Sequence, residues 1–201
     1  MTSRPRNPRG EGNRLRDQLL AATAEVLNEV GDADRVSVRA IARRAGVSPT
    51  ALYLQFPDRD ALVTAAVDAG FDTFNDELTS AAAVPGTPDE RLLAMGHAYL
   101  AFSEHKPALY SILFSARRPL VGKEDHDVDR DQALDGLVAL LQLRSPSLSA
   151  DAAGELAILI WSSLHGYAML RTVRPHMQWP SAEEFLRTLL TVYVPGSANA
   201  D

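Results

Sequence analysis

The chain has 201 residues, of which 46% are apolar, and it contains no cysteine. This is enough to build one or two cored domains, and the missing cysteine excludes a disulfide framework, a thiol nucleophile and a thiolate metal site. The net charge of −6 is uneven, because residues 1–60 carry ten Arg against eight Asp and Glu, whereas residues 61–201 carry ten Lys and Arg against eighteen. A DNA-facing first part and an acidic body are therefore expected.

Residues 1–13 are rich in Arg, Pro and Gly, a composition that opposes helix formation. They predict either a disordered basic arm that follows phosphates or enters a minor groove, or an ordinary ragged terminus. The start of the chain has no apolar core of a secretory signal, and no run of 18 apolar residues occurs. We therefore expect no membrane partner and a cytoplasmic protein.

A first helix is predicted from about Asn13 to Val30, ended by the turn residues 31–34. A second, over 38–45, has an apolar stripe at Val38, Ile41, Ala42 and Ala45. Ser37 precedes it as an N-cap, and Gly46 supplies the left-handed conformation that ends it.

Ser48 and Pro49 are an N-cap and a proline at the first helical position, so a third helix is predicted from there to about Phe56. Leu52 and Phe56 should face inward. Two short helices joined by such a turn form a helix-turn-helix, although a helical hairpin with solvated arginines is the plainer alternative. With the first helix they define a DNA-binding domain over residues 14–60.

From Asp58 onward the pattern predicts only helices, giving an all-α fold of about nine helices with no strand. Asp58 caps a long helix to about Ala82, and Pro85–Pro88 is the clearest linker. Thr87, Pro88 and Glu90 form a capping box for the next helix. Further helices are predicted from Pro107 and over 131–143, 149–171 and 181–194. The body thus spans 61–196, followed by a tail over 197–201.

The sequence gives little support for an enzyme or a cofactor. It has no phosphate-binding glycine loop and no Gly-x-Ser-x-Gly, and its five histidines lack metal-ligand spacing. His126 lies among Asp125, Asp127 and Asp129, where a cation could bind, but a solvated charged loop is the simpler interpretation. No metal is predicted. The alternative is a binding protein or enzyme in which the helical body is the working part and the DNA-binding domain is vestigial.

The string from Ile41 to Ser48 (IARRAGVS), followed by ALYLQFPDRDAL at 51–62, resembles the TetR family of bacterial transcriptional regulators. The resemblance implies an N-terminal helix-turn-helix domain, a C-terminal helical domain for ligand binding and dimerisation, and a double-stranded DNA operator. In that setting Tyr53, Ser37, Arg39 and Arg59 are expected at phosphates. Thr50 and Gln55 are expected to read bases, and Ser48, Pro49, Ala51 and Leu54 complete the expected surface. Pro49, Gln55 and Arg59 differ from residues usual in the family, so no operator sequence can be transferred.

A weaker similarity concerns the body. Trp161, His165 and Gly166, together with KPALYSILF at 106–114, are similar to a TetR subgroup with a Trp…His-Gly signature. The resemblance implies a pocket for a small apolar effector of unknown identity. Its predicted lining is Met95, Tyr99, Phe102, Tyr110, Leu113, Phe114, Trp161, His165 and Met169. The alternative is that these residues only fill a helical core.

One helix-turn-helix reads few bases, so a homodimer on a palindromic operator is expected, formed through the last two helices. The predicted seam comprises Ala153, Gly154, Ala157, Ile158, Ile160, Phe185, Leu186, Leu189, Leu190 and Tyr193. The expected function is a ligand-responsive regulator, a repressor released by the effector. An activator or a ligand-independent regulator of the same fold is the alternative.

Overall fold

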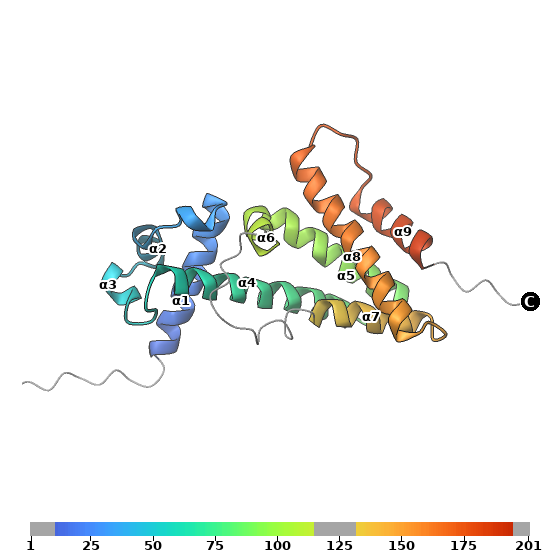
Figure 1. Ribbon diagram of the computed structural model, residues 1–201, viewed down its shortest axis with the longest axis horizontal. Coiled ribbons are helices and arrows are strands. Elements are labelled where there is room, and N and C mark those ends of the chain that lie inside the picture. The colour runs from blue at the N-terminus through green and yellow to red at the C-terminus, as the bar shows by residue number, and fades with distance from the viewer. Residues whose placement is uncertain (1–10, 115–131, 195–201) are drawn as a thin grey trace, which may run out of the picture. The chain divides into compact units, whose positions relative to one another are not determined.

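The computed structural model describes residues 11–114 and 132–194, and it is built from helices alone (Figure 1). Within those ranges there is no strand, as the sequence predicts. The predicted basic arm, apart from its last residues, the loop at 117–131 and the tail lie outside the described residues. The helices are α1 (Glu11–Val30), the 3-10 turn η1 (Ala33–Arg35), α2 (Val38–Ala45), α3 (Pro49–Leu52), α4 (Arg59–Ala82), α5 (Pro88–His105), α6 (Pro107–Leu113), α7 (Gln132–Arg144), α8 (Ala150–Val173) and α9 (Ala182–Tyr193).

Contacts within the chain divide the described residues into two units. The first contains α1 to α3, the part of α4 up to Phe71, and α6. The second contains α4 from Asp72 onward, α5, and α7 to α9. The sequence predicts a boundary at residue 60, whereas this division falls inside α4, so one continuous helix contributes to both units.

The first unit is a small helical core in which α1 packs against α2 and α6, and α3 packs against α2 (Figure 1). Leucine and isoleucine side chains from four helices fill it, namely Leu19, Leu27, Ile41, Leu52 and Leu62, all with no exposed surface. Burying each such side chain contributes about 1.5–3 kcal/mol, so this core is what holds the short helices α2 and α3 in place.

The helix-turn-helix is set by its caps, as predicted. Ser37 Oγ accepts the Ala40 N–H and Ser48 Oγ accepts the Ala51 N–H, each over 3.2 Å. Gly46 has φ +67°, a conformation that costs glycine little, and it ends α2. The two caps and the glycine therefore fix where each of the paired helices begins and ends.

The prediction that the second helix of this motif runs to Phe56 is wrong, because α3 ends at Leu52. Leu54 N–H and Gln55 N–H donate to the carbonyls three residues earlier, which tightens the chain into a turn. Pro57 disfavours a helical conformation at the preceding residue, and Phe56 is buried at 3% exposure. The segment from Tyr53 to Gln55 is consequently a turn that follows a single helical turn.

In the second unit α5 packs against α7, α8 and α9, and α8 also packs against α7 (Figure 1). The capping box at the start of α5 is confirmed, since Thr87 N–H donates to Glu90 and Glu90 N–H donates to Thr87 Oγ1. The Thr87 N–H lowers the pKa of Glu90. The predicted limits of α7, α8 and α9 agree with the structure to within two residues.

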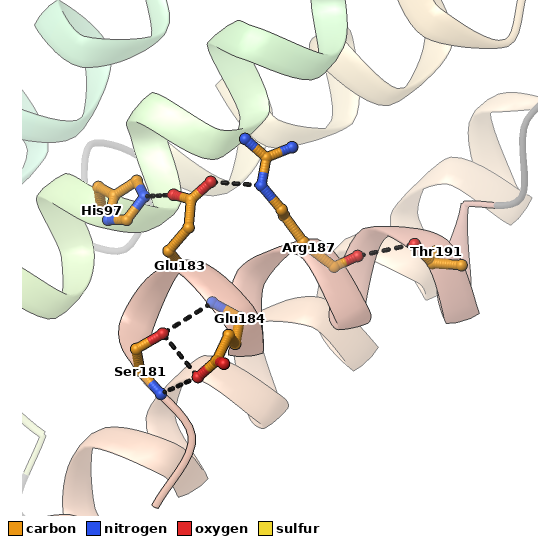
Figure 2. Close-up of polar contacts among 6 residues, drawn as sticks. All are labelled: His97, Ser181, Glu183, Glu184, Arg187 and Thr191. Carbon is orange, nitrogen blue, oxygen red and sulfur yellow. Dashed lines mark hydrogen bonds and ion pairs between the residues drawn. The ribbon is translucent and has the colours of Figure 1, made fainter.

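Two polar contacts fix the first turn of α9 (Figure 2). Ser181 and Glu184 form a capping box, and the Ser181 N–H lowers the pKa of Glu184. Glu183 contacts His97 Nε2 on α5 over 2.7 Å and pairs with Arg187, and these partners, His97 first, lower the pKa of Glu183. The N-terminal end of α9 is thus held to α5 by a side-chain hydrogen bond as well as by packing.

Half of the residues predicted for a dimer seam are already covered within the single chain. Ala153, Ala157, Ile160, Leu186 and Leu189 are at most 7% exposed and belong to the core of the single chain. The half-buried members of the set are Gly154, Phe185, Leu190 and Tyr193. Of the predicted set, Ile158 is exposed at 52%. The large apolar side chains that α8 does expose are Ile158, Leu159, Trp161, Leu170 and Val173.

Candidate nucleic-acid interface

The candidate interface lies on α3 and the turn that follows it. Pro49 and Thr50 are exposed in the first helical turn, and the turn presents Tyr53 at 54% and Leu54 at 72% exposure. Ala51 and Gln55 are half-buried. The segment thus presents hydroxyl, amide and apolar groups together, the chemistry that contacts phosphates, base edges and thymine methyl groups.

Ser37 and Ser48 lie at the two helix N-termini and their hydroxyls are engaged in capping. Their oxygens therefore accept bonds from the chain itself, and the free N–H groups of the first turns are what remains for an anion. Arg39 is exposed in the first turn of α2, close to such a terminus. This arrangement suits a phosphate.

Arg59, predicted to contact DNA, has a role inside the first unit. Its Nε donates to the Val36 carbonyl over 2.7 Å, another guanidinium nitrogen donates to the Ala33 carbonyl, and a third pairs with Asp60 over 2.5 Å. These bonds tie the start of α4 to the turn before α2. The guanidinium is a donor to the Val36 carbonyl and a second donor to the Ala33 carbonyl, which also accepts the Val36 N–H over 3.4 Å.

Arg44 makes two ion pairs that the sequence did not predict. Its two terminal nitrogens contact Glu25 and Glu29 on α1 over 2.8 and 2.6 Å. Glu29 first, then Glu25, raise the pKa of Arg44. The spacing of four between the two glutamates was the one available signal, because it places both on one face of a helix.

In the second unit, the residues predicted to line an effector pocket gather partly around Tyr99. Its hydroxyl lies 3.3 Å from His165 Nδ1, and its ring meets Phe74 edge to face at 5.3 Å. Phe74 meets Phe102 in the same way at 5.1 Å. Met95 is buried, Met169 is half-buried, and Trp161 is 39% exposed. The cluster is aromatic with one polar pair, Tyr99 and His165.

Burial lowers the pKa of His165, so the neutral imidazole is favoured. A neutral ring can either donate to or accept from a ligand, according to its tautomer. The remaining predicted lining residues, Tyr110, Leu113 and Phe114, belong to the first unit, where the Phe114 ring meets Phe71 at 5.7 Å. The nine predicted residues are therefore divided between the units.

Among the residues that the structure describes, no three His, Asp or Glu side chains are grouped to hold a metal ion. The cluster around His126 lies outside these residues. In the same part of the chain, no helix is long and apolar enough to cross a bilayer.

The fold and this surface define the class: a helical protein with an N-terminal DNA-binding helix-turn-helix. Residues 19–66 match the family described as "Bacterial regulatory proteins, tetR family", and residues 92–193 match "Tetracyclin repressor-like, C-terminal domain". The chain belongs to the TetR family. Members of this family are DNA-binding transcriptional regulators, so the protein is a regulator and not an enzyme, as the sequence predicted.

Curated relatives agree with this assignment. The chain is 35% identical over 152 residues to the HTH-type transcriptional regulator BetI of Escherichia coli K12, a match that covers 63% of this chain and 77% of BetI. It is 29% identical over 98 residues to the nucleoid occlusion factor SlmA of Vibrio campbellii, covering 49% of this chain and half of SlmA.

Solved structures show the same fold. A protein of unknown function from Rhodococcus sp. RHA1 has a TM-score of 0.74 at 24% identity, covering 94% of this chain and 97% of that one. A tetR-family transcriptional regulator from Streptomyces coelicolor has a TM-score of 0.71 at 20% identity, covering 90% and 79%.

Proposed function

We propose that this regulator is a repressor that binds a palindromic operator as a homodimer and is released by a small apolar molecule. The observation that carries the proposal is the capped helix-turn-helix, which buries Leu52 and Phe56 and exposes Thr50, Tyr53 and Leu54. The exposed tyrosine hydroxyl can donate a hydrogen bond to a DNA phosphate, and the adjacent exposed leucine can contact a thymine methyl group.

In this proposal the Tyr53 hydroxyl donates a hydrogen bond to a phosphate. Arg39 and the helix N-termini capped by Ser37 and Ser48 make further contacts to the DNA phosphates. Thr50 and Gln55 read base edges. Pro49, Ala51 and Leu54 supply apolar contact. Arg59 is left out of the phosphate contacts because two backbone carbonyls and Asp60 already engage its guanidinium.

The dimer would form through the outer face of α8, together with α9. Ile158, Leu159 and Trp161 are exposed over one turn, and Leu170 and Val173 continue the apolar surface toward the end of the helix. Large apolar side chains gathered on one exposed helix commonly mark an interaction surface. A second copy of the chain is the partner proposed, because two recognition helices are needed to read two half-sites.

The effector would bind in the second unit near Tyr99 and His165, where aromatic rings surround one hydrogen-bonding pair. An apolar molecule with one polar group fits this chemistry. The response would pass along α4, since that helix contributes to both units. A coupling free energy of about 1–3 kcal/mol is sufficient for a 5- to 150-fold change in operator affinity.

The test is selection of bound sequences from random duplex DNA by the full chain, read by sequencing. A palindrome with half-sites about one helical turn apart would support the dimeric regulator and locate its genes. A single, non-repeated half-site would contradict the dimer. An operator overlapping a promoter supports repression, whereas one upstream of it supports the alternative of an activator.

A further inference from the structure

Helix α2 carries three arginines with different surroundings. Arg39 and Arg43 are exposed, and within the described part of the chain neither has an ion pair. Arg44 instead sits between Glu25 and Glu29 of α1, with 35% of its side chain exposed. The planar guanidinium can satisfy two carboxylates at once, which a lysine ammonium does less well. The Arg44 guanidinium is therefore paired with carboxylates of α1.

A second contact holds the same end of α2 to the same helix. Gln18 Nε2 on α1 donates to the Ala45 carbonyl over 2.6 Å, and Ala45 itself is buried. Gly46 follows at once and turns the chain toward α3. Both contacts thus act on the last turn of α2, which is the point from which the DNA-reading segment departs.

Helix α1 also reaches the far end of that segment. The Arg16 guanidinium lies 4.5 Å from the centre of the Phe56 ring, a cation–π distance. The segment from Gly46 to Phe56 is therefore anchored at both ends on α1, by Arg44 and Gln18 at its start and by Arg16 at its end.

We propose that Arg44 is a positioning residue for DNA recognition, which holds the recognition segment at the angle needed for the major groove and makes no phosphate contact itself. Helix α3 has a single turn, so it has too few backbone bonds to fix its own orientation. The orientation has to come from the end of α2 and from Phe56. Arg44 supplies it through Glu25 and Glu29.

The decisive variant is Glu25→Ala combined with Glu29→Ala, assayed on the duplex selected from random DNA. Two negative charges are lost from the DNA-binding domain, so simple electrostatics predicts tighter binding. Positioning predicts the opposite sign: binding weaker by about threefold to tenfold, the range expected for a forked ion-pair network. Tighter or unchanged binding would overturn the proposal. Asp17→Ala removes one charge from the same helix and is the control expected not to weaken binding.

Salt dependence separates positioning from phosphate contact. Removing a cationic side chain that contacts a DNA phosphate reduces the magnitude of the slope of log affinity against log salt by about 0.9. We expect Arg44→Ala to weaken DNA binding while the salt slope stays nearly unchanged. Arg39→Ala on the same helix is expected to reduce the salt slope. The double variant Arg44→Glu with Glu29→Arg keeps the net charge and should bind DNA more tightly than Arg44→Ala, because the ion pair is restored with its charges exchanged. A slope lowered by Arg44→Ala, or no restoration, would count against the proposal.

The proposal rests on operator binding, so one measurement is made without DNA. Hydrogen exchange of the α2 amides should be faster in Arg44→Ala than in the unmodified chain, at a temperature where circular dichroism shows both folded. Unchanged exchange would overturn the positioning role. Failure of the selection experiment would instead refute the operator proposal and leave this result standing.

Discussion

Leu186 of α9 lies directly on the backbone of α5 at Gly96, where an added Cβ would come within 2.5 Å of Leu186 Cδ2. Leu186 is buried at 3% exposure, so it has little room to move. The glycine therefore sets how closely the two helices approach.

Gly96→Ala is expected to destabilise the protein by about 1 kcal/mol, because overpacking costs about 1–3 kcal/mol and the gain in helix propensity is about 0.5–1 kcal/mol. Urea unfolding measures it. Gly136→Ala in α7 is the matched control: nothing lies within 4 Å of its added Cβ, so only the gain should be seen. Equal effects of the two substitutions would contradict the packing argument.

Tyr53→Phe and Gln55→Ala should separate affinity from sequence choice. Loss of the tyrosine hydroxyl is expected to weaken binding to all duplexes alike by about fivefold, the value of one hydrogen bond. Loss of the glutamine amide should relax the preference at one base pair by about 1–3 kcal/mol. The measurement is affinity for the selected duplex relative to mixed-sequence DNA. A uniform loss from both variants would refute this division of roles.

Arg59→Ala should lower the free energy of unfolding by about 1–3 kcal/mol, since the Val36 carbonyl loses its guanidinium donor and the Ala33 carbonyl keeps only the 3.4 Å bond from the Val36 N–H. Arg59→Lys should recover part of this, because one ammonium can reach one carbonyl. Thermal unfolding of the three proteins gives the comparison. Asp60→Ala is the control, since it removes an exposed pair partner and leaves both carbonyl bonds intact.

The His165 pair gives a pH dependence with a defined sign. Burial lowers its folded pKa below the ordinary value of 6.5, so the unfolded chain binds the proton first as pH falls. Stability from the neutral ring is present above pH 6.5 and is lost as pH falls from there toward the folded pKa, below which the loss stops. Urea unfolding at about pH 7.5 and about pH 5.5 should show a smaller decrease in His165→Gln than in the unmodified chain. His176→Gln, at an exposed position, should behave like the unmodified chain.

Ile158→Glu tests the proposed dimer. A charge placed on the exposed face of α8 should convert a dimer into monomers in light scattering and weaken binding to the selected palindrome. Val84→Glu introduces the same charge at another exposed apolar position, on the α4–α5 loop, and should leave the mass unchanged. A monomer mass for the unmodified chain would refute the dimer directly.

Local sequence signals were sufficient to predict many of the helix ends in this molecule. Ser37, Gly46, Ser48 and Thr87 each act within three or four residues of themselves, so the sequence predicts the helix ends they define. The helix-turn-helix follows from those ends. The limits of the long helices followed from the same kind of signal.

Features that depend on distant partners, or on which side of a helix is covered, have no signal in the local sequence. Arg44 meets glutamates 15 and 19 positions away, and Arg59 meets carbonyls 23 and 26 positions away, so neither role has a local signature. Helix α8 is apolar around much of its circumference, with Ala157 buried and Ile158 exposed side by side. Periodicity alone could not separate its core face from its outer face.

The recognition segment, residues 46–56, contains buried residues that belong to the folding core and exposed residues that do not. Leu52 and Phe56 belong to the folding core, whereas Thr50, Tyr53 and Leu54 project from it. Substitutions at the projecting positions therefore leave the stability of the domain nearly untouched. Under the proposed DNA contacts, one or two substitutions at these positions would change the preferred operator while the domain stays folded.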